Sequence, residues 1–508
     1  MKSDLVIVYH RQPYEEVIED GKVHYRENSS PNGIVPTMKG FLGQADRGAW
    51  VAWKEAEDPA NPEFERVIEI SDSFGTYSVS RLPLTKEQVK SFYHVTSKEA
   101  FWPILHGFKE RYNYDPVDWP TFRAVNWLFA EAAAQQATDD AVIWIHDYNL
   151  WLVPGYLRQL KPNATICFFH HTPFPGPDMF NVLPWREEII NSLMTCDSVG
   201  FHIPRYAQNF AAVVRSIKGA RLVSEAETPS TLSATGVALN DRRMPLMLEH
   251  MGATTCVHTN PVGVNFDYIE KLANKPEVAE RVREIRAELG DTKLILSVSR
   301  TDYTKGNIEQ LEAFGRLLER RPDLRGKVRL MLVSVGANRN MTAYAEVQEA
   351  IESLVGRING TFGSFDWQPV TLVSQAIPLA QLVAYYRAAD IASITPLADG
   401  LNLVASEFCA ARDLTNPGAL ILSEFAGCAV LLDGAIPVNP FSHSSMDSGL
   451  EQALAMGMEE ASARMAALRR SARTWDIAAW THSEIAHFRT LQRERHGTGP
   501  KIAPAPAA

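Results

Sequence analysis

Two short segments of the chain combine charged residues and glycine in a way that suits phosphate and sugar chemistry. In the first, residues 297–306 (SVSRTDYTKG), an apolar strand pattern runs into Arg300 and then Lys305. Two cations beside a helix N-terminus could bind a diphosphate and stabilise it as a leaving group. The alternative is a solvated loop whose charges pair with Asp302 or Glu309. The helical pattern that follows is carried by Ile308, Leu311 and Phe314.

The second segment, residues 395–408 (TPLADGLNLVASEF), also leads from a predicted strand end into a helix. Gly400 lets the backbone come close to a ligand, and the N–H groups of a first helical turn point outward to meet oxygens. The carboxylate of Asp399 could hold sugar hydroxyls, and that of Glu407 a ribose diol. Alternatively, Asp399 is a turn residue or a helix cap.

Residues 168–175 (FFHHTPFP) place two histidines, His170 and His171, between a buried strand pattern and a proline-rich turn. Metal ligation, acid–base or oxyanion chemistry and plain packing are all open for this pair. The chain has no Walker A segment, no G-x-G-x-x-G and no D-x-D pair suited to a nucleotide-bound metal. The sequence therefore favours chemistry that needs no metal.

Weaker signals occur in the first half of the chain. Arg11 follows the first strand pattern, Gly33 lies in a loop, Trp102 precedes a proline, and Asp147 and Asn149 follow another strand pattern. Each has an ordinary alternative, because an arginine after a strand is often a surface cation and a Trp-Pro pair often belongs to a core.

The elements that position these residues follow a βα rhythm. Amphipathic segments such as 121–137 separate short apolar runs, and this alternation predicts a parallel α/β sheet. The rhythm restarts after a break, which predicts a second doubly wound domain. The apolar runs are 5–10, 141–147, 164–171, 198–202, 293–300, 328–336, 370–377, 392–397 and 419–427.

The break falls near 257–269, just before a helical pattern from Pro276 to Gly290. The polar stretch 219–250 is interpreted as an insertion or mobile hairpin. We expect two Rossmann-like domains facing each other across a deep cleft, with ligands at the C-terminal ends of the strands. The expected parts are a first domain at 1–260, a second at 261–475, a helix at 476–496 packing on the first domain, and a disordered tail at 497–508.

The bulk properties exclude several classes of protein. A net charge of −10 without a marked basic run makes nucleic acid an unlikely partner. The five cysteines lack C-x-x-C spacing and are interpreted as reduced thiols. No apolar run reaches membrane-spanning length and no signal peptide pattern is present, so a cytoplasmic protein without a membrane partner is expected.

Taken in order, these motifs resemble the trehalose-6-phosphate synthase family of retaining glycosyltransferases, over nearly the whole chain. The family is known for the GT-B fold, and the resemblance therefore implies that fold. The motifs that carry it are Arg11, Trp102, IHDYN, FFHHTPFP, SVSRTDYTKG, RINGTFGS and TPLADGLNLVASEF.

Within the family, four stretches are most similar to members that join ADP-glucose to sn-glycerol 3-phosphate. Members that make trehalose 6-phosphate usually carry Gly-Gly-Leu at Asn32-Gly33-Ile34 and a histidine at Asn149. These departures concern the domain that binds the acceptor. The four stretches are LVIVYHRQPYEEV, SPNGIVPTMKGF, FYHVTSKEAFWPILHGF and HDYNLWLVPGYLRQLKPNA.

The resemblance also implies roles for individual residues. Arg300 and Lys305 would neutralise the departing diphosphate, His171 would lie near the donor sugar, and Asp147 would position the acceptor hydroxyl, while His170 would pack within its own domain. The remaining donor-binding residues would be Gly33, Asp399, Gly400, Leu401, Asn402, Leu403, Val404 and Glu407. The acceptor-binding residues would be Arg11, Tyr93, Trp102, Asn149 and Arg339.

The expected reaction needs no cofactor and no metal. It would be followed by a separate phosphatase that acts on the product, and a homo-oligomer is compatible with the family. Two rival functions stay open: a trehalose-6-phosphate synthase that uses glucose 6-phosphate as acceptor, and a catalytically silent subunit that binds sugar phosphates.

Overall fold

The computed structural model describes residues 2–20, 22–27, 34–234, 237–336 and 342–496. The chain divides into two compact units. The first unit comprises residues up to 228, 241–261 and those from 478 onward, and the second comprises 229–240 and 262–477. The break between the units thus follows Pro261, and residues 229–240 belong to the second unit.

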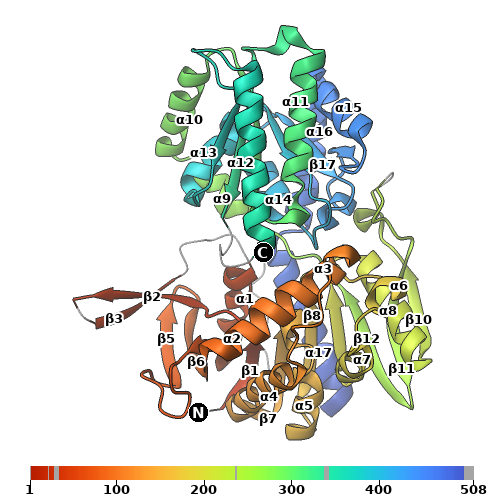
Figure 1. Ribbon diagram of the computed structural model, residues 1–508. Helices are drawn as coiled ribbons and strands as arrows, with labels where there is room; N and C mark the ends of the chain where they lie inside the picture. Colours follow the sequence, from red (N-terminus) through yellow and green to blue (C-terminus); the bar gives the residue numbers. More distant parts are fainter. Residues whose placement is uncertain (1, 21, 28–33, 235–236, 337–341, 497–508) are drawn as a thin grey trace. The chain divides into compact units, whose positions relative to one another are not determined.

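The first unit is built on a ten-stranded sheet in the order β10-β11-β12-β9-β8-β7-β1-β4-β6-β5 (Figure 1). Its strands from β12 to β6 pair in parallel, and antiparallel strands close both edges. The strands are β1 (Ser3–Val8), β4 (Gly48–Glu55), β5 (Val67–Asp72), β6 (Gly75–Leu84), β7 (Ala137–His146), β8 (Thr165–His170), β9 (Ser198–Phe201), β10 (Arg221–Glu227), β11 (Arg243–His250) and β12 (Ala253–Thr259). A separate hairpin is formed by β2 (Tyr14–Glu19) and β3 (Lys22–Glu27).

Helices connect these strands. The expected helix at 121–137 is α4, which contacts β1, β4, β6 and β7. The other helices are α1 (Ile34–Leu42), α2 (Lys86–Val89), a π-helix (Lys90–Phe101), α3 (Trp102–Leu105), α4 (Trp119–Gln136), α5 (Val153–Leu160), α6 (Pro177–Phe180), α7 (Arg186–Leu193), α8 (Pro204–Lys218) and α17 (Ile477–His496).

The interpretation of residues 219–250 as an insertion or mobile hairpin is wrong in part. Strands β10 and β11 pair with each other, and β11 pairs with β12, so both extend the main sheet. No residue of β10 is buried, and β11 buries only Pro245 and Leu248, because strands at or beside a sheet edge need fewer apolar residues than central ones. The polar composition of residues 219–250 therefore gave no indication of these two strands.

Helix α17 packs on the first unit through aromatic side chains. The ring centroid of Trp480 lies 5.4 Å from that of Trp144 on β7 and 5.7 Å from that of Phe169 on β8. The Asn260 amide donates hydrogen bonds to the carbonyl oxygen of Trp480 and the carboxylate of Glu484, both on this helix. The last described helix is therefore part of the core of the first unit.

The second unit has a six-stranded, wholly parallel sheet in the order β15-β14-β13-β16-β17-β18. Numbered within the unit, this order is 3-2-1-4-5-6, that of a dinucleotide-binding Rossmann sheet. The strands are β13 (Lys293–Arg300), β14 (Val328–Val335), β15 (Val370–Val373), β16 (Ile391–Ile394), β17 (Ala419–Ser423) and β18 (Ile436–Val438).

Helices lie on both faces of this sheet (Figure 1). Leu311, Phe314 and Leu317 on α11 recur at helical spacing and are buried against the sheet together with residues of α12 and α15. The expected helix from Pro276 is α10, which ends at Leu289. The helices are α9 (Phe266–Ala273), α10 (Pro276–Leu289), α11 (Asn307–Arg320), α12 (Thr342–Phe362), α13 (Leu379–Ala388), α14 (Leu403–Ala411), α15 (His443–Ala455) and α16 (Met458–Thr474).

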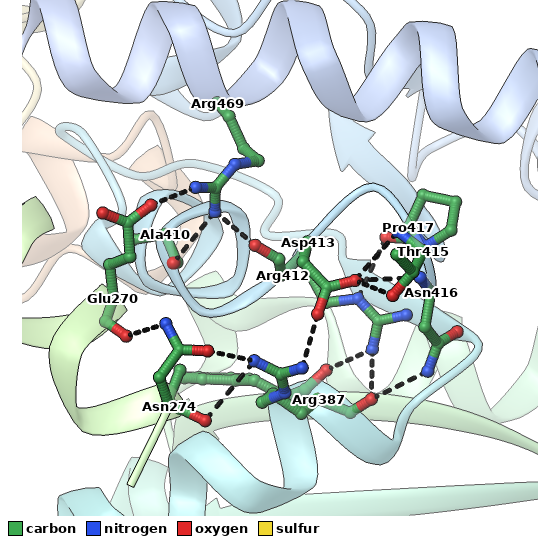
Figure 2. Close-up of polar contacts among 12 residues, drawn as sticks. Glu270, Asn274, Arg387, Ala410, Arg412, Asp413, Thr415, Asn416, Pro417 and Arg469 are labelled. Atoms are coloured by element: carbon green, nitrogen blue, oxygen red, sulfur yellow. Dashed lines mark hydrogen bonds and ion pairs between the residues drawn. The ribbon is translucent and has the colours of Figure 1, made fainter.

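A buried arginine fixes the C-terminal end of α14. The guanidinium of Arg412 donates to the carbonyl oxygens of Arg387 and Pro417 (Figure 2). It also donates to those of Tyr386 and Ala389. Burial lowers the pKa of Arg412 to about 9. A charge at this depth is tolerated because carbonyl dipoles surround it. This network ties α13, α14 and the loop after α14 together.

The five cysteines are all free thiols, as expected. None of the helices within the described ranges is long and apolar enough to cross a membrane.

Candidate functional site

In both units, the predicted site residues follow strands at the point where the strand order reverses. In the second unit, neighbouring strands β13 and β16 lead into Lys305 and Asp399. In the first unit, neighbouring strands β1 and β7 lead into Arg11 and Asp147. Loops diverge from the sheet at such a switch point and leave a crevice, which is the usual ligand site of an open α/β sheet.

Lys305 and Asp399 form an ion pair in the second unit. The Lys305 Nζ lies 2.7 Å from an Asp399 carboxylate oxygen, and both side chains are largely buried. The ion-pair partner of Lys305 is thus Asp399 rather than Asp302 or Glu309, and the Asp302 carboxylate accepts a hydrogen bond from the backbone N–H of Thr304. Lys305 and Asp399 therefore hold each other in place at the switch point.

Asn402 caps α14 and also contacts the ion pair. Its side-chain oxygen accepts from the N–H of Ala405, and its Nδ2 donates to the Asp399 carboxylate at 3.1 Å. The helix-cap role considered for Asp399 therefore belongs to Asn402. The N–H groups of Leu403 and Val404 precede the hydrogen-bond ladder of α14, so this helix start can receive an anion.

Two glycines bring the loops of this site close together. A Cβ on Gly306 would lie 2.1 Å from the carbonyl oxygen of Thr395, and one on Gly427 would lie 2.1 Å from that of Gly400. The N–H of Leu397 donates to the carbonyl oxygen of Thr304 at 2.8 Å. These contacts fix the loop after β13 against the loop after β16.

Arg300 and Glu407 differ sharply in exposure. Arg300 ends β13 and is exposed, and its guanidinium makes no ion pair with the residues that the structure describes. Glu407 is buried on α14, where the hydroxyl of Tyr386 donates to its carboxylate at 2.9 Å. Burial raises the pKa of Glu407 to about 7. Arg300 is open to an anion, whereas Glu407 faces the protein interior.

In the first unit, Arg11 lies beside Tyr93 at the exit of β1. The pKa of Arg11 is raised, first by its electrostatic interaction with Tyr9 and then by that with Tyr93. The His10 ring centroid is 5.4 Å from that of Tyr93. The expected acceptor residues Arg11 and Tyr93 are thus brought together.

Arg11 and His10 also line a cavity of about 360 Å³. This volume suits a small ligand. Neither ring nitrogen of His10 has a hydrogen-bond partner within the described ranges, and burial lowers its pKa. The other lining residues are Gln12, Tyr14, Glu16, Trp53, Lys54 and Glu55.

Asp147 follows β7 in a strained backbone conformation, with φ 72° and ψ 162°. This region costs about 1–3 kcal/mol for a residue other than glycine, and such residues cluster at functional sites. Its carboxylate accepts from the backbone N–H of His171 at 3.4 Å. Burial raises the pKa of Asp147 to about 6, although hydrogen bonding and the charges of Lys98 and Arg11 oppose the rise.

The two adjacent histidines have different surroundings. His170 is buried, its Nδ1 lies within hydrogen-bonding distance of Thr172, and burial lowers its pKa to about 3. This confirms that His170 packs within its own unit. The ring of His171 lies between two others, with Nε2 2.9 Å from Nδ1 of His146 and Nδ1 3.3 Å from Nε2 of His202.

Two further acceptor candidates are buried. Trp102 is 6% exposed, and the Lys98 Nζ lies 3.8 Å from its ring centroid. Asn149 is 1% exposed, and its Nδ2 has no hydrogen-bond partner in the part of the chain that the structure covers. Gly33 and Arg339, for which binding roles were also predicted, lie outside the described residues. No cluster of three or more His, Cys, Asp or Glu in the described segments is arranged to hold a metal ion.

Comparison with known proteins agrees with the resemblance carried by these motifs. The model of glycosyltransferase family 20 matches residues 3–490. The chain belongs to this family. It is similar to the glucosylglycerol-phosphate synthase of Synechocystis sp., with 47% identity over 482 residues that cover 95% of this chain and 96% of the relative.

More distant family 20 relatives are trehalose-6-phosphate synthases. That of Mycobacterium sp. (strain KMS) is 37% identical over 501 residues, which cover 98% of this chain and 97% of the relative. The crystal structure of an alpha,alpha-trehalose-phosphate synthase (UDP-forming) from Burkholderia vietnamiensis matches with a TM-score of 0.84 and 29% identity, covering 98% of this chain and 99% of that one. The chain is therefore a glycosyltransferase, and the expected α/β GT-B class with two Rossmann-like sheets is confirmed.

Several residues of these sites were not singled out in the sequence. They are Lys98, His146, His202 and Tyr386. His146 and His202 end or follow apolar strand patterns, a position that could have marked them. Lys98 and Tyr386 lie on helices and reach the sites through tertiary packing, for which the local sequence carries no signal.

Proposed function

We propose that this family 20 enzyme transfers glucose from ADP-glucose to sn-glycerol 3-phosphate and retains the α configuration. The observation that carries the donor half is the site at the β13/β16 switch point, where Lys305, Asp399 and the start of α14 converge. The chain is 47% identical to a glucosylglycerol-phosphate synthase and 37% identical to a trehalose-6-phosphate synthase, which supports glycerol 3-phosphate as the acceptor over glucose 6-phosphate.

In the proposed reaction, the bond from the glucose C1 to the diphosphate breaks and a bond from C1 to the acceptor hydroxyl forms on the same face. The hydroxyl proton passes to an oxygen of the departing diphosphate, which serves as the base. Arg300 and Lys305 neutralise the charge that develops on this leaving group. Lys305 exchanges its contact with Asp399 for the diphosphate, which frees the Asp399 carboxylate for hydroxyls of the glucose.

The first unit supplies the acceptor groups. Arg11 and Tyr93 hold the acceptor phosphate, and Asp147 orients the attacking hydroxyl. Both ring nitrogens of His171 are engaged by His146 and His202. We therefore propose that the backbone C=O of His171, and not its ring, stabilises the positive charge that develops on the sugar. Glu407 reaches the donor ribose only after its side chain turns away from Tyr386.

The proposed reaction requires no cofactor or metal, and a separate phosphatase would release the free glucoside from its product. The first test incubates the purified chain with ADP-glucose or UDP-glucose and with glycerol 3-phosphate or glucose 6-phosphate. We expect ADP release and an α-anomeric product, seen by proton NMR, with ADP-glucose and glycerol 3-phosphate. Turnover with glucose 6-phosphate alone would instead identify a trehalose-6-phosphate synthase. Thermal stabilisation by these ligands without nucleotide release would identify a silent binding subunit.

The second test addresses the leaving group. Arg300→Ala and Lys305→Ala should each lower kcat at least about 100-fold, because each removes a charge that stabilises the transition state. Lys327→Ala is the matched control. Lys327 is exposed and lies just before the first residue of β14, at the edge of the sheet opposite to the site. Turnover of both site variants within tenfold of wild type would exclude the leaving-group role.

A further inference from the structure

The π-helix Lys90–Phe101 contains a cation, Lys98, to which the sequence motifs assigned no role. Hydrogen bonds in a π-helix join residues five apart, so such residues lie one above the other, whereas in an α-helix they are rotated by about 140°. The hydroxyl of Ser97 donates to the carbonyl oxygen of Phe92, five residues earlier. Tyr93 and Lys98 are also five apart, and the Lys98 Nζ lies 5.7 Å from the Tyr93 ring centroid. The helix thus aligns Lys98 with a residue of the acceptor site.

Tyr93 is the common neighbour of two cations. Arg11 at the exit of β1 interacts electrostatically with Tyr93, and the Lys98 Nζ approaches the same ring from the π-helix. Both cations also act electrostatically on His10 and Asp147, which flank the switch point. Two like charges in one site repel each other, and an anion with two negative charges between them removes this repulsion.

Lys98 also covers the ring of Trp102. Its Nζ lies 3.8 Å from the Trp102 ring centroid, and the His106 ring centroid lies 4.0 Å from that of Trp102. Trp102 is 6% exposed. An aromatic face in contact with an ammonium group and an imidazole is not available to stack on a sugar ring.

We propose that Lys98 is a specificity-determining residue of the acceptor site, binding the acceptor phosphate together with Arg11 and withholding the Trp102 ring from a pyranose acceptor. This inference rests on the proposed function for the identity of the acceptor. It adds a residue that selects a small phosphorylated polyol over a sugar phosphate.

The test compares Lys98→Met, which keeps the length of the side chain but removes the charge, with Lys98→Arg, which keeps the charge. Lys90→Met is the matched control, because Lys90 is exposed on the same π-helix. A charge-assisted hydrogen bond contributes a factor of roughly 10 to 150, so Lys98→Met should raise the KM for glycerol 3-phosphate by that factor. We expect kcat and the KM for the donor to stay within about threefold of wild type, and Lys98→Arg to restore most of the loss.

Two further measurements separate phosphate binding from a structural role. The inhibition constant of inorganic phosphate, measured in competition with the acceptor, should rise in parallel with the KM. The ratio of kcat/KM for glycerol 3-phosphate to that for glucose 6-phosphate should fall in Lys98→Ala, because that substitution shortens the side chain and uncovers Trp102. A KM and a phosphate inhibition constant within twofold of wild type would overturn the inference, as would a fall in kcat alone.

Calorimetric titration with inorganic phosphate keeps this test separate from that of the proposed function. If wild type does not glucosylate glycerol 3-phosphate, the proposed function fails, but phosphate binding can still be compared between wild type and Lys98→Met. Equal phosphate affinity in folded wild type and Lys98→Met would overturn the role of Lys98, whatever the acceptor. Should Lys98→Met fold poorly, Lys98→Gln replaces it in both measurements.

Discussion

Replacing Gly306 with alanine tests whether the packed loops of the second unit position the proposed donor site. Gly306 has φ 68° and ψ 23°, and a Cβ there would lie 2.1 Å from the carbonyl oxygen of Thr395. Real Cβ contacts essentially never fall below 3.0 Å, so the two loops must separate by nearly 1 Å. That displacement would reach Lys305 and Asp399, which lie on these loops.

Gly219 gives a control with nearly the same backbone conformation and none of the crowding. It has φ 63° and ψ 22° at the end of α8, and a Cβ there would meet nothing within 4 Å. Gly219→Ala should therefore cost only the left-handed backbone strain of about 1–2 kcal/mol. Gly306→Ala should cost this strain plus roughly 1–3 kcal/mol for the overpacked contact.

The assay measures the free energy of unfolding in urea and kcat/KM for the nucleotide-sugar donor. We expect Gly306→Ala to be less stable than Gly219→Ala and to lose about 100-fold in kcat/KM, because a 1 Å displacement of binding groups can have that effect. Gly219→Ala should keep wild-type kcat/KM. Equal stability and equal kcat/KM in the two variants would refute the claim that the contact at Gly306 holds the site together.

Three more substitutions test individual side chains. Asp147→Asn should abolish the acidic limb of the kcat/KM profile near pH 6, because the carboxylate titrates there; a limb unchanged in Asp147→Asn would assign it to another group. The raised pKa of Asp147 also means that stability is lost as pH rises from about 4 to 6, so Asp147→Asn should raise Tm at pH 7.5 but not at pH 4. Glu407→Gln should raise the KM for the donor about tenfold or more with little change in kcat, and a KM equal to wild type would exclude contact with the donor. Arg412→Met should lower the free energy of unfolding by about 3–5 kcal/mol, since it leaves several buried carbonyl oxygens unpaired; a loss below about 1 kcal/mol in urea denaturation would contradict that account.

Central parallel strands and amphipathic helices could be predicted from the sequence because burial on both faces requires continuous apolar runs. Leu294 to Leu296 on β13 and the Leu311, Phe314, Leu317 face of α11 are of this kind. Strands at or beside the sheet edges were harder to predict, because β5 alternates exposed and buried residues, no residue of β10 is buried, and β5, β10 and β11 all carry charged residues. The π-helix could not be predicted, because the spacing of four between its buried residues Phe92, Thr96 and Ala100 is equally that of an α-helix.

The site was predictable where a residue follows a strand and unpredictable where it depends on partners. Lys305 was expected to pair with a nearby acid if it paired at all, yet its partner Asp399 is 94 residues away. The pairing arises because β13 and β16 are neighbours only after the sheet folds. The sequence likewise could not reveal that the ring of His171 is engaged by His146, which ends β7, and by His202, which follows β9.

Each of the two switch points contains a residue other than glycine whose backbone is strained, which the residue types alone could not show. Among the described residues, the non-glycine positions with positive φ include Asp147 in the first unit and Asn402 in the second. Glycine would adopt either conformation at lower cost, so the side chains must provide what glycine cannot. Asn402 caps α14 and holds Asp399 beside Lys305, and the strained backbone at Asp147 lets its carboxylate meet the N–H of His171. In each unit, the surrounding fold therefore stabilises a strained residue whose polar group is fixed before any ligand arrives, as expected for catalysis by preorganised charges.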